Sequence, residues 1–582
     1  MISIDALRPD RMSLHGYGRP TTPTFERLAA SGAHCTESIS TTAFTQPALP
    51  SMLTSSLPLS YGGYDQGAVG RPPTLFKVMG DNSYRTTLLS TFPWVNRFYG
   101  YSNGVQAENL LFTLNALVGV ASQTMASIVR AYNENEITQG DMLDAVRPVL
   151  LKLYEDLESY CDYRLSQRRH DLVDLSNERL LTDGYDYPRV KKIIARHRAD
   201  FINNPAKYTA RYLSEVPNSQ NWIAQDWRLA RRPRTVCRLM FQRLAAAIMG
   251  PLSPSAARLM EFPNKRYVDA QALANRVIRT IDSQDPDHPF FIWTHFFDTH
   301  VPYCPGAGTS WKHNARQHLD ALGYRNDIDL SVAVKKRPET EEEWSAWRAL
   351  YDASAHYVDS QVARILDTLR ARGLDDNTLV VITSDHGEEL GEHGDVSHHF
   401  RLYEHNLRIP MIFKGPDVER RDISALTTIM DISPSIADIA GVDSPPAWEG
   451  SSVFSSEIDG RDHALAEAFH SGNCLFDHRP PYIAVRTREY KYLWKEYRDV
   501  TDRYSSTEPE LYRYRDDPDE QNDLYRPDHP EVAKLNGIVA RRLAEIPEIS
   551  DARIRNAFNA VGNAAIAEVR GSQPVAPAQD AE

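Results

Sequence analysis

The sequence predicts an α/β fold with a parallel sheet that is covered by helices. The clearest sign is a continuous apolar, β-branched run at residues 379–383, which is typical of a strand buried on both faces. Further strand-like runs occur at residues 290–293 and 411–413, and helical patterns separate the runs along the chain. Strands that alternate with helices over such a length are typical of α/β folds.

Length and composition are those of a globular protein with more than one domain. The chain has 582 residues, which is too long for one ordinary hydrophobic core. Hydrophobic residues make up 42% and charged residues 25%, as in globular proteins rather than disordered ones. The net charge of −13 argues against a nucleic-acid partner.

The cysteines and the apolar segments predict a cytoplasmic location. Five scattered cysteines form no CxxC pair, so we expect buried free thiols in a reducing compartment. Residues 1–5 show no signal peptide. The longest apolar stretch, residues 110–129, is too polar for a membrane span.

The first part of the α/β domain is assigned to residues 1–107. Residues 2–5 predict a short strand, residues 23–30 a helix, and residues 88–91 another strand. Only four residues precede Asp5, whereas a strand has typically about five. We therefore expect either that the natural chain begins earlier or that this strand is short.

The middle of the chain predicts an insertion followed by a return to the α/β domain. Residues 108–261 carry long helical periodicities and few strand-like runs, so they predict a helical insertion that forms a lid or a wall of a cleft. Residues 262–460 predict the second part of the α/β domain, with a helix at 341–372 that stops at Gly373.

The C-terminal part predicts a smaller subdomain. Residues 461–570 contain short strand-like runs at 483–485 and 492–494, and then a helix at 531–544. Residues 571–582 are rich in Pro, Ala and Gln and predict a disordered tail.

Polar clusters follow several of the predicted strands. Asp385 and His386 come directly after the run at 379–383, and Asp5 ends the first strand. Ligands in open α/β sheets gather at the carboxyl ends of strands, and a carboxylate beside an imidazole is half of a metal site. Alone, such a pair is also typical of an ordinary turn. Two further clusters, at residues 293–303 and 398–404, favour a single cleft.

In these segments the chain resembles the sulfatases and their relatives in the alkaline-phosphatase superfamily. The resemblance covers nearly the whole chain except the insertion and the tail. It implies an alkaline-phosphatase-like sandwich, with a large mixed, mostly parallel central sheet flanked by helices and a small C-terminal α+β subdomain. It also implies a hydrolase of sulfate or phosphate esters. The similar stretches are residues 3–10, 45–54, 298–303, 384–394, 402–410, 431–438, 490–492 and 516–524.

The chain also departs from the sulfatase pattern. Thr45 stands where sulfatases have the Cys or Ser that becomes formylglycine, and Leu49 replaces the Arg of that signature. A Thr at this place resembles the superfamily's phosphodiesterases and phosphoethanolamine transferases. Asp385 and His386 stand where many sulfatases have Asp-Asn, and His398 where many have a sulfate-binding Lys.

The resemblance and the residue types together imply a mechanism. Asp5, Thr45, Asp385 and His386 would hold one divalent metal ion, and Thr45 would attack the ester to give a covalent Thr intermediate. Mixed oxygen and nitrogen ligands favour Zn²⁺ or Mn²⁺ over Ca²⁺, which remains an alternative.

The other polar residues of these segments receive less central roles. His300 is the candidate for protonating the leaving group, and His398 would bind a substrate oxygen or a second metal. We interpret His295 as a structural strand residue that faces away from His300, Asp10 as a helix cap and Glu388 as a support of the loop.

Three classes of function remain open at this point. The favoured one is a hydrolase whose partner is a small-molecule or glycan ester, with phosphodiester or phosphomonoester chemistry favoured over sulfate by the Thr. The second is a transferase of phosphoethanolamine or phosphoglycerol groups to glycans or lipids. Such enzymes usually carry membrane helices that this sequence lacks. The third is an inactive metal-binding module, which the intact Asp5, Thr45, Asp385 and His386 disfavour.

Overall fold

The structure is a computed structural model, and the following account concerns the residues that it describes. The predicted tail and much of the predicted helical insertion lie outside these residues. The described residues are 1–61, 67–96, 99–112, 114, 117–118, 132, 138–166, 185–204, 268–285, 287–301, 303, 338, 340–398, 401–468, 482–495 and 508–546.

The chain forms two compact units, which are described separately. The first unit comprises residues 1–112, 242–472 and 479–547, and the second comprises residues 113–241, 473–478 and 548–582. The first unit contains both large sheets and all the residues predicted to form the site.

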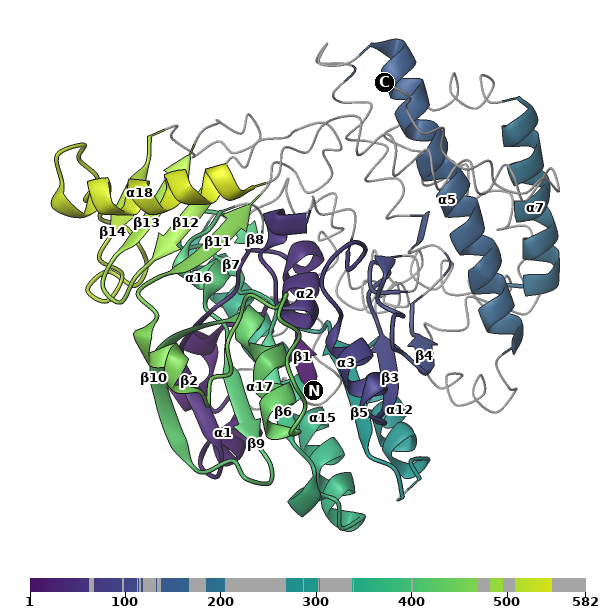
Figure 1. Cartoon of the computed structure of the whole chain (residues 1–582), viewed down its shortest axis with the longest axis horizontal. Coiled ribbons are helices and arrows are strands. Elements are labelled where there is room, and N and C mark those ends of the chain that lie inside the picture. The colour runs from purple at the N-terminus through teal and green to yellow at the C-terminus, as the bar shows by residue number, and fades with distance from the viewer. Residues whose placement is uncertain are drawn as a thin grey trace, which may run out of the picture. The chain divides into compact units, whose positions relative to one another are not determined.

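An eight-stranded sheet forms the centre of the first unit (Figure 1). Seven strands are parallel and β9 alone runs antiparallel to its neighbours, which confirms the predicted mixed, mostly parallel sheet. In spatial order the strands are β10 (Arg421–Thr428), β2 (Ala33–Ile39), β9 (Met411–Lys414), β6 (Val380–Ser384), β1 (Ile2–Ile4), β5 (Phe290–Phe296), β3 (Arg85–Ser90) and β4 (Ala107–Leu110).

The short first strand, β1, lies in the middle of this sheet. It pairs in parallel with β5 on one side and with β6 on the other, and its three residues are buried. Strands covered on both faces are mostly apolar, as the fully buried Ile4 and Ile382 illustrate. The carboxyl ends of β1 and β6 therefore lie side by side, where Asp5 and Asp385 follow.

Helices accompany the sheet in two groups. In one group α1 and α12 contact α15; in the other α2, α3 and α17 contact one another (Figure 1). The long α15 begins with a capping box between Thr340 and Glu343, which satisfies two backbone N–H groups. The bounds are α1 (Pro23–Ala29), α2 (Thr45–Thr54), α3 (Leu75–Asp81), α12 (Ala270–Asp282), α15 (Glu341–Ala371), α16 (Glu404–Leu407) and α17 (Ile432–Ile439).

A second, four-stranded antiparallel sheet confirms the small C-terminal sheet and helix. Apolar side chains of this sheet pack against one face of the helix α18 (Pro530–Glu545), including Ile483 and Tyr492 against Leu535. The strands are β11 (Ala464–Ala468), β12 (Tyr482–Arg486), β13 (Lys491–Lys495) and β14 (Glu510–Tyr512), and a separate hairpin joins β7 (Glu389–Leu390) to β8 (Val396–Ser397).

A buried ion network joins this second sheet to the central one. Arg486 of β12 donates from Nε to Glu404 of α16 at 3.1 Å and from Nη2 to Glu37 of β2 at 2.7 Å. The Lys491 ammonium lies 2.9 Å from Glu520 in the same network. Buried charges are tolerated only when they are paired, so each partner depends on the others.

We expect Arg486→Ala to lower the free energy of unfolding by about 3–5 kcal/mol, because buried Glu404 then loses its closest cation. Urea unfolding followed by circular dichroism measures this loss. The matched control is Arg515→Ala, since the half-exposed Arg515 lies 3.6 Å from the same Glu37 and should cost less than about 1 kcal/mol. Equal losses in the two variants would contradict the assignment.

The described part of the second unit is a pair of helices. α5 (Gln139–Ser166) and α7 (Tyr187–Asn203) contact each other, and Arg198 of α7 pairs with both Glu155 and Glu158 of α5. β4 belongs to the central sheet although it reaches past residue 107, and the second unit begins at residue 113. The boundaries 108 and 261 and the role of the insertion as a lid stay predictions.

Two of the five cysteines can be checked. Cys35 and Cys161 are buried free thiols, as expected, and Cys237, Cys304 and Cys474 lie outside the described residues. Among the helices that the structure describes, none combines the length and the apolar character that crossing a membrane requires.

Candidate active site

The turns after β1 and β6 are hydrogen-bonded to each other. The Ala6 amide donates to Oδ1 of Asp385 at 3.1 Å, and the Leu7 amide donates to Oγ of Ser384 at 2.9 Å. Ala6 has a φ of 56°, a left-handed conformation that is strained for a residue with a side chain. These contacts hold Asp5 and Asp385 next to each other in the interior, where both are fully buried.

Thr45 lies at the first position of α2, beside these carboxylates. Its Oγ1 donates to Oδ2 of Asp5 at 3.0 Å and lies 3.1 Å from Nε2 of His386. The N-terminus of a helix carries unpaired N–H groups and a partial positive charge, which favour an anion at this place. The hydroxyl therefore combines a carboxylate neighbour with surroundings suited to negative charge.

His386 is oriented by the backbone of its own loop. Its Nδ1 lies 2.7 Å from the carbonyl oxygen of Gly387, so Nε2 faces Thr45 and Oδ2 of Asp385, the latter at 3.3 Å. A Cβ at position 387 would overlap the carbonyl oxygen of His405, and the Gly387 amide donates to Asn406 at 2.7 Å. Only glycine permits this close approach, which fixes the loop on α16.

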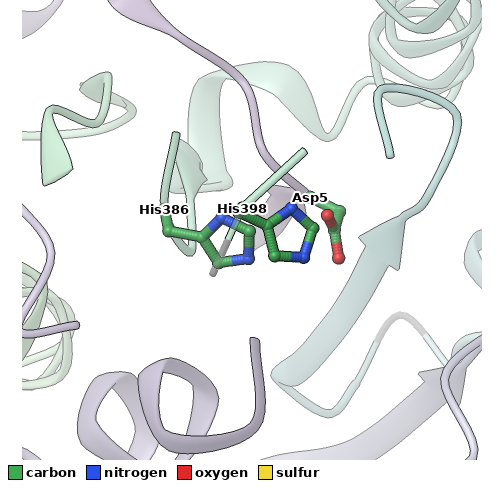
Figure 2. Close-up of side chains that lie close together, drawn as sticks. All are labelled: Asp5, His386 and His398. Carbon is green, nitrogen blue, oxygen red and sulfur yellow. The ribbon is translucent and has the colours of Figure 1, made fainter. Parts of the chain in front are cut away.

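His398 and His300 complete the cluster. The His398 ring centroid lies 4.2 Å from that of His386 and 4.7 Å from that of His300. Figure 2 shows the imidazoles of His386 and His398 close to the carboxylate of Asp5, and single ligand atoms of these three residues lie within 4.8 Å of one another. The structure thus brings together all six residues that were predicted to form the site, counting Thr45 and Asp385.

His295, interpreted from the sequence as a structural strand residue that faces away from His300, also lies in this cluster. Its Nε2 is 3.3 Å from Oδ2 of Asp5 and 3.8 Å from Oδ2 of Asp385. That interpretation assumed that side chains alternate between the two faces of an extended chain from His295 to His300. The assumption fails because β5 ends at Phe296 and a turn precedes His300. Asp5, His295 and Asp385 form a second group of close ligand atoms.

The buried charges of the site influence one another. Burial would raise the pKa of Asp5, but the neighbouring His300, His295 and His386 hold that pKa below its ordinary value. Burial, together with the charge of Asp5, raises the pKa of Asp385. Burial likewise raises the pKa of Glu388 well above its ordinary value.

The donor set fits a divalent cation. Oδ1 of Asp5 and Oδ2 of Asp385 are buried and have no hydrogen-bond partner among the described residues. A carboxylate oxygen of Asp5 lies within 4.8 Å of one of Asp385, so the two ionised groups repel each other. A cation between them would offset that repulsion and satisfy both oxygens. The oxygen and nitrogen atoms of Asp5, Thr45, Asp385 and His386 are of the types that transition-metal ions bind.

Arg8 and Asp10 lie beside the site. Arg8 pairs with Asp10 at 2.7 Å and with Glu392 at 2.7 Å, and it donates to the backbone oxygen of Glu388. Asp10 is therefore an ion-pair partner rather than the predicted helix cap, since it lies inside a short 3-10 helix. Arg8 ties the turn after β1 to the loop that carries Glu388.

Glu389 lies in the hairpin next to the site, and its surroundings make the stability of the fold sensitive to acid. It accepts amide hydrogen bonds from His393 and Asp395 and lies near His405 and Arg401. Although burial opposes it, these partners lower the pKa of Glu389 from 4.5 to about 2. A lowered pKa stabilises the fold above pH 4.5, and this contribution is lost as the pH falls toward 2.

We therefore expect the free energy of unfolding to fall by about 2 kcal/mol more in the wild type than in Glu389→Gln between pH 6 and about 3. Urea titrations at several pH values between 6 and about 3 measure the difference. Parallel pH profiles of the two proteins would show that Glu389 is not held ionised by its neighbours.

A known protein family matches most of the chain. The family model described as Sulfatase matches residues 1–151 and 191–442, which is more than half of the chain. The chain belongs to the sulfatase family. A second model, described as N-sulphoglucosamine sulphohydrolase, C-terminal, matches residues 391–548 of this sulfatase-family protein. The predicted family is thereby confirmed.

Curated sulfatases match the protein over part of their length. An uncharacterized sulfatase of Escherichia coli K12 is 25% identical over 277 residues, covering 45% of this chain and 52% of that protein. The choline-sulfatase of Rhizobium meliloti is 24% identical over 262 residues, covering 42% and 50%. The matches thus span about half of these relatives.

Solved structures confirm the fold of this sulfatase-family protein. One, in complex with its substrate D-glucosamine-2-N,6-O-disulfate, has a TM-score of 0.54 and 14% identity, covering 95% of this chain and 98% of that one. The phosphonate monoester hydrolase of Agrobacterium radiobacter has a TM-score of 0.51 and 16% identity, covering 94% of each chain. At these identities the likeness concerns the fold alone.

Proposed function

We propose that this sulfatase-family protein is a metal-dependent hydrolase of sulfate or phosphate esters in which Thr45 is the nucleophile. The observation that carries the proposal is the placement of the Thr45 hydroxyl 3.0 Å from Asp5 and 3.1 Å from His386, at the N-terminus of α2. In this reaction the Thr45 oxygen bonds to phosphorus or sulfur, the ester bond breaks, and water later releases the Thr-bound group.

Asp5, Thr45, Asp385 and His386 would hold one divalent metal ion. When bound, the ion lowers the pKa of the hydroxyl and neutralises negative charge on the ester oxygens. His386 offers a nitrogen ligand, which favours Zn²⁺ or Mn²⁺ over Ca²⁺. His398, whose ring contacts that of His386, would bind a substrate oxygen or a second ion.

Two side chains assist the nucleophile and the leaving group. Asp5 accepts the Thr45 hydrogen bond and so orients the oxygen for attack. His300 donates from Nδ1 to the carbonyl oxygen of Val301, so Nε2 would give a proton to the leaving group only from the doubly protonated ring. Burial lowers the pKa of His300, which limits the protonated fraction near neutral pH.

The residue types favour phosphate diesters or monoesters over sulfate esters. Thr45 has no route to a formylglycine, and Leu49 of α2 is fully buried where the sulfatase signature has a cation. Similar proteins include enzymes named for sulfate esters and for phosphonate monoesters, so both chemistries occur on this fold. Small-molecule or glycan esters are the proposed substrates.

The proposed location is the cytoplasm. The buried free thiols of Cys35 and Cys161 support it, because thiols stay reduced in that compartment.

Turnover of paired aryl esters tests the proposal. The purified protein, loaded with Zn²⁺ or Mn²⁺, is assayed on a phosphodiester, a phosphomonoester, a phosphonate monoester and a sulfate of the same phenol. We expect the phosphodiester or the phosphomonoester to have the highest kcat/KM. A preference for the sulfate would overturn the phosphate assignment, and metal binding without turnover of any ester would favour the inactive module.

The same assay addresses the transferase alternative. A transferase would pass the Thr45-bound group to an added alcohol, so phenol release would rise with alcohol concentration and the product would be an alcohol ester. For a hydrolase we expect inorganic product or the simple monoester, with phenol release that does not depend on the alcohol.

A further inference from the structure

The hydrogen-bond partners of the active-site histidines determine what each ring can do. In a neutral imidazole one ring nitrogen donates a hydrogen bond and the other accepts, and only the unprotonated nitrogen can bind a metal ion. Two overlapping groups of ligand atoms share Asp5, one with His386 and one with His295. The partner of Nδ1 in each ring distinguishes them.

His386 has the protonation that a metal ligand needs. Its Nδ1 lies 2.7 Å from the carbonyl oxygen of Gly387, and a carbonyl oxygen can only accept. The proton of neutral His386 is therefore on Nδ1, and the lone pair of Nε2 faces Thr45 and Asp385. An outer partner that fixes a ring in this way is typical of metal-binding histidines.

His295 has the opposite arrangement. Its Nδ1 lies 2.8 Å from Oγ of Ser3, and the indole Nε1 of Trp293, which can only donate, donates to the same oxygen at 2.9 Å. The Ser3 hydroxyl has one proton to give, either to Nδ1 at 2.8 Å or to the carbonyl of Thr294 at 3.4 Å. The shorter contact is the stronger, so Nδ1 of His295 accepts.

We propose that His295 is a fixed hydrogen-bond donor to Asp5 rather than a metal ligand. With Nδ1 accepting, the ring proton is on Nε2, which points at Oδ2 of Asp5 at 3.3 Å and Oδ2 of Asp385 at 3.8 Å. A series of hydrogen bonds thus runs from Trp293 through Ser3 and His295 to Asp5. It holds the Asp5 carboxylate in place, which makes His295 a positioning residue. The consequence for the metal rests on the proposed function, in which Asp5 is a metal ligand.

The proton position is tested directly in the wild-type protein. Ring nitrogen shifts of protein labelled with ¹⁵N-histidine are recorded without metal, with the His295 signals assigned by their loss in His295→Gln. We expect a protonated Nε2 and an unprotonated Nδ1, both retained after Zn²⁺ is added. A proton on Nδ1 with Nε2 unprotonated, or an Nε2 signal that moves to a metal-bound shift with Zn²⁺, would overturn the proposal.

Metal affinity separates a positioning role from a ligand role. In His295→Gln the amide nitrogen reaches about as far as Nε2 and can still donate, so we expect a Kd for Zn²⁺ within about threefold of the wild type. In His295→Leu no donor remains, and we expect a Kd that is about 10–100-fold higher. A Gln variant as weak as the Leu variant would indicate a ligand.

A reference variant and a further readout keep the outcomes distinct. His386→Gln removes a proposed ligand and should weaken Zn²⁺ binding more than either change at His295. Thermal melting without metal identifies a variant that fails to fold, in which case the ¹⁵N measurement on the wild type decides. If the wild type binds Zn²⁺ but hydrolyses no ester, the proposed function fails. The ¹⁵N shifts and the Zn²⁺ affinities still decide whether His295 is a hydrogen-bond donor or a metal ligand.

Discussion

Replacing Thr45 with alanine is expected to lower kcat/KM for the best ester substrate by about 10⁴-fold or more. The hydroxyl is the only atom of this side chain that can form the covalent bond, and it contacts both Asp5 and His386. Steady-state assays of the two proteins under equal metal loading measure the loss. A variant that keeps more than about a tenth of the activity would show that Thr45 is not the nucleophile.

Thr45→Ser is the matched control, because it keeps the hydroxyl and removes only a methyl group. We expect it to retain far more activity than Thr45→Ala. Intact mass of rapidly quenched wild-type protein should reveal the phosphoryl or sulfuryl adduct, and Thr45→Ala should show none. The side chain is nearly buried at 4% exposure, so thermal melting of both variants is needed to confirm the fold.

The centre of the sheet could be predicted because its signals are local. The runs that became β1, β5 and β6 are mostly apolar and buried at nearly every position, as is typical of strands covered on both faces. Asp5 and Asp385 follow two of these strands directly, and parallel strands bring their carboxyl ends to the same edge. Two apolar runs and the residues that follow them were therefore enough to predict Asp5 and Asp385 as site residues.

The outer strands gave no such signal. β2 and β10 pair at one edge of the sheet, and their sequences mix apolar with polar residues. Arg421 and Asp422 at the start of β10 are exposed, because an edge strand need not be apolar on both faces. Apolar periodicity therefore fails where water covers one side of the strand.

His295 shows what a pairwise reading of strands would have added. In register Ser3 pairs with His295, and Trp293 lies two residues from His295 on the same face of β5. A Ser on one strand therefore lies beside a Trp and a His of the neighbouring strand, and its hydroxyl can hydrogen-bond to both. The register is not available from one sequence, so the role of His295 required the structure.

Replacing Asp5 with asparagine is expected to abolish the stabilisation that a metal ion gives and to lower activity by about 10³-fold. In the wild type, Zn²⁺ or Mn²⁺ at about 100 times its Kd should raise the free energy of unfolding by about 2.7 kcal/mol, because the ion binds only the folded state. Asp5→Asn removes the carboxylate that both candidate ligand groups share, so this increase should vanish.

The same substitution is expected to destabilise the metal-free protein by about 1–3 kcal/mol. The neighbouring His300, His295 and His386 hold the pKa of Asp5 below its ordinary value, so the folded protein favours the ionised carboxylate and a neutral amide loses that attraction. Asp10→Asn is the matched control: its side chain is 48% exposed and paired with Arg8, and the metal-induced shift should be unchanged. The metal-induced shift distinguishes a ligand from a structural residue, because a purely structural aspartate would lose stability without metal and still keep that shift.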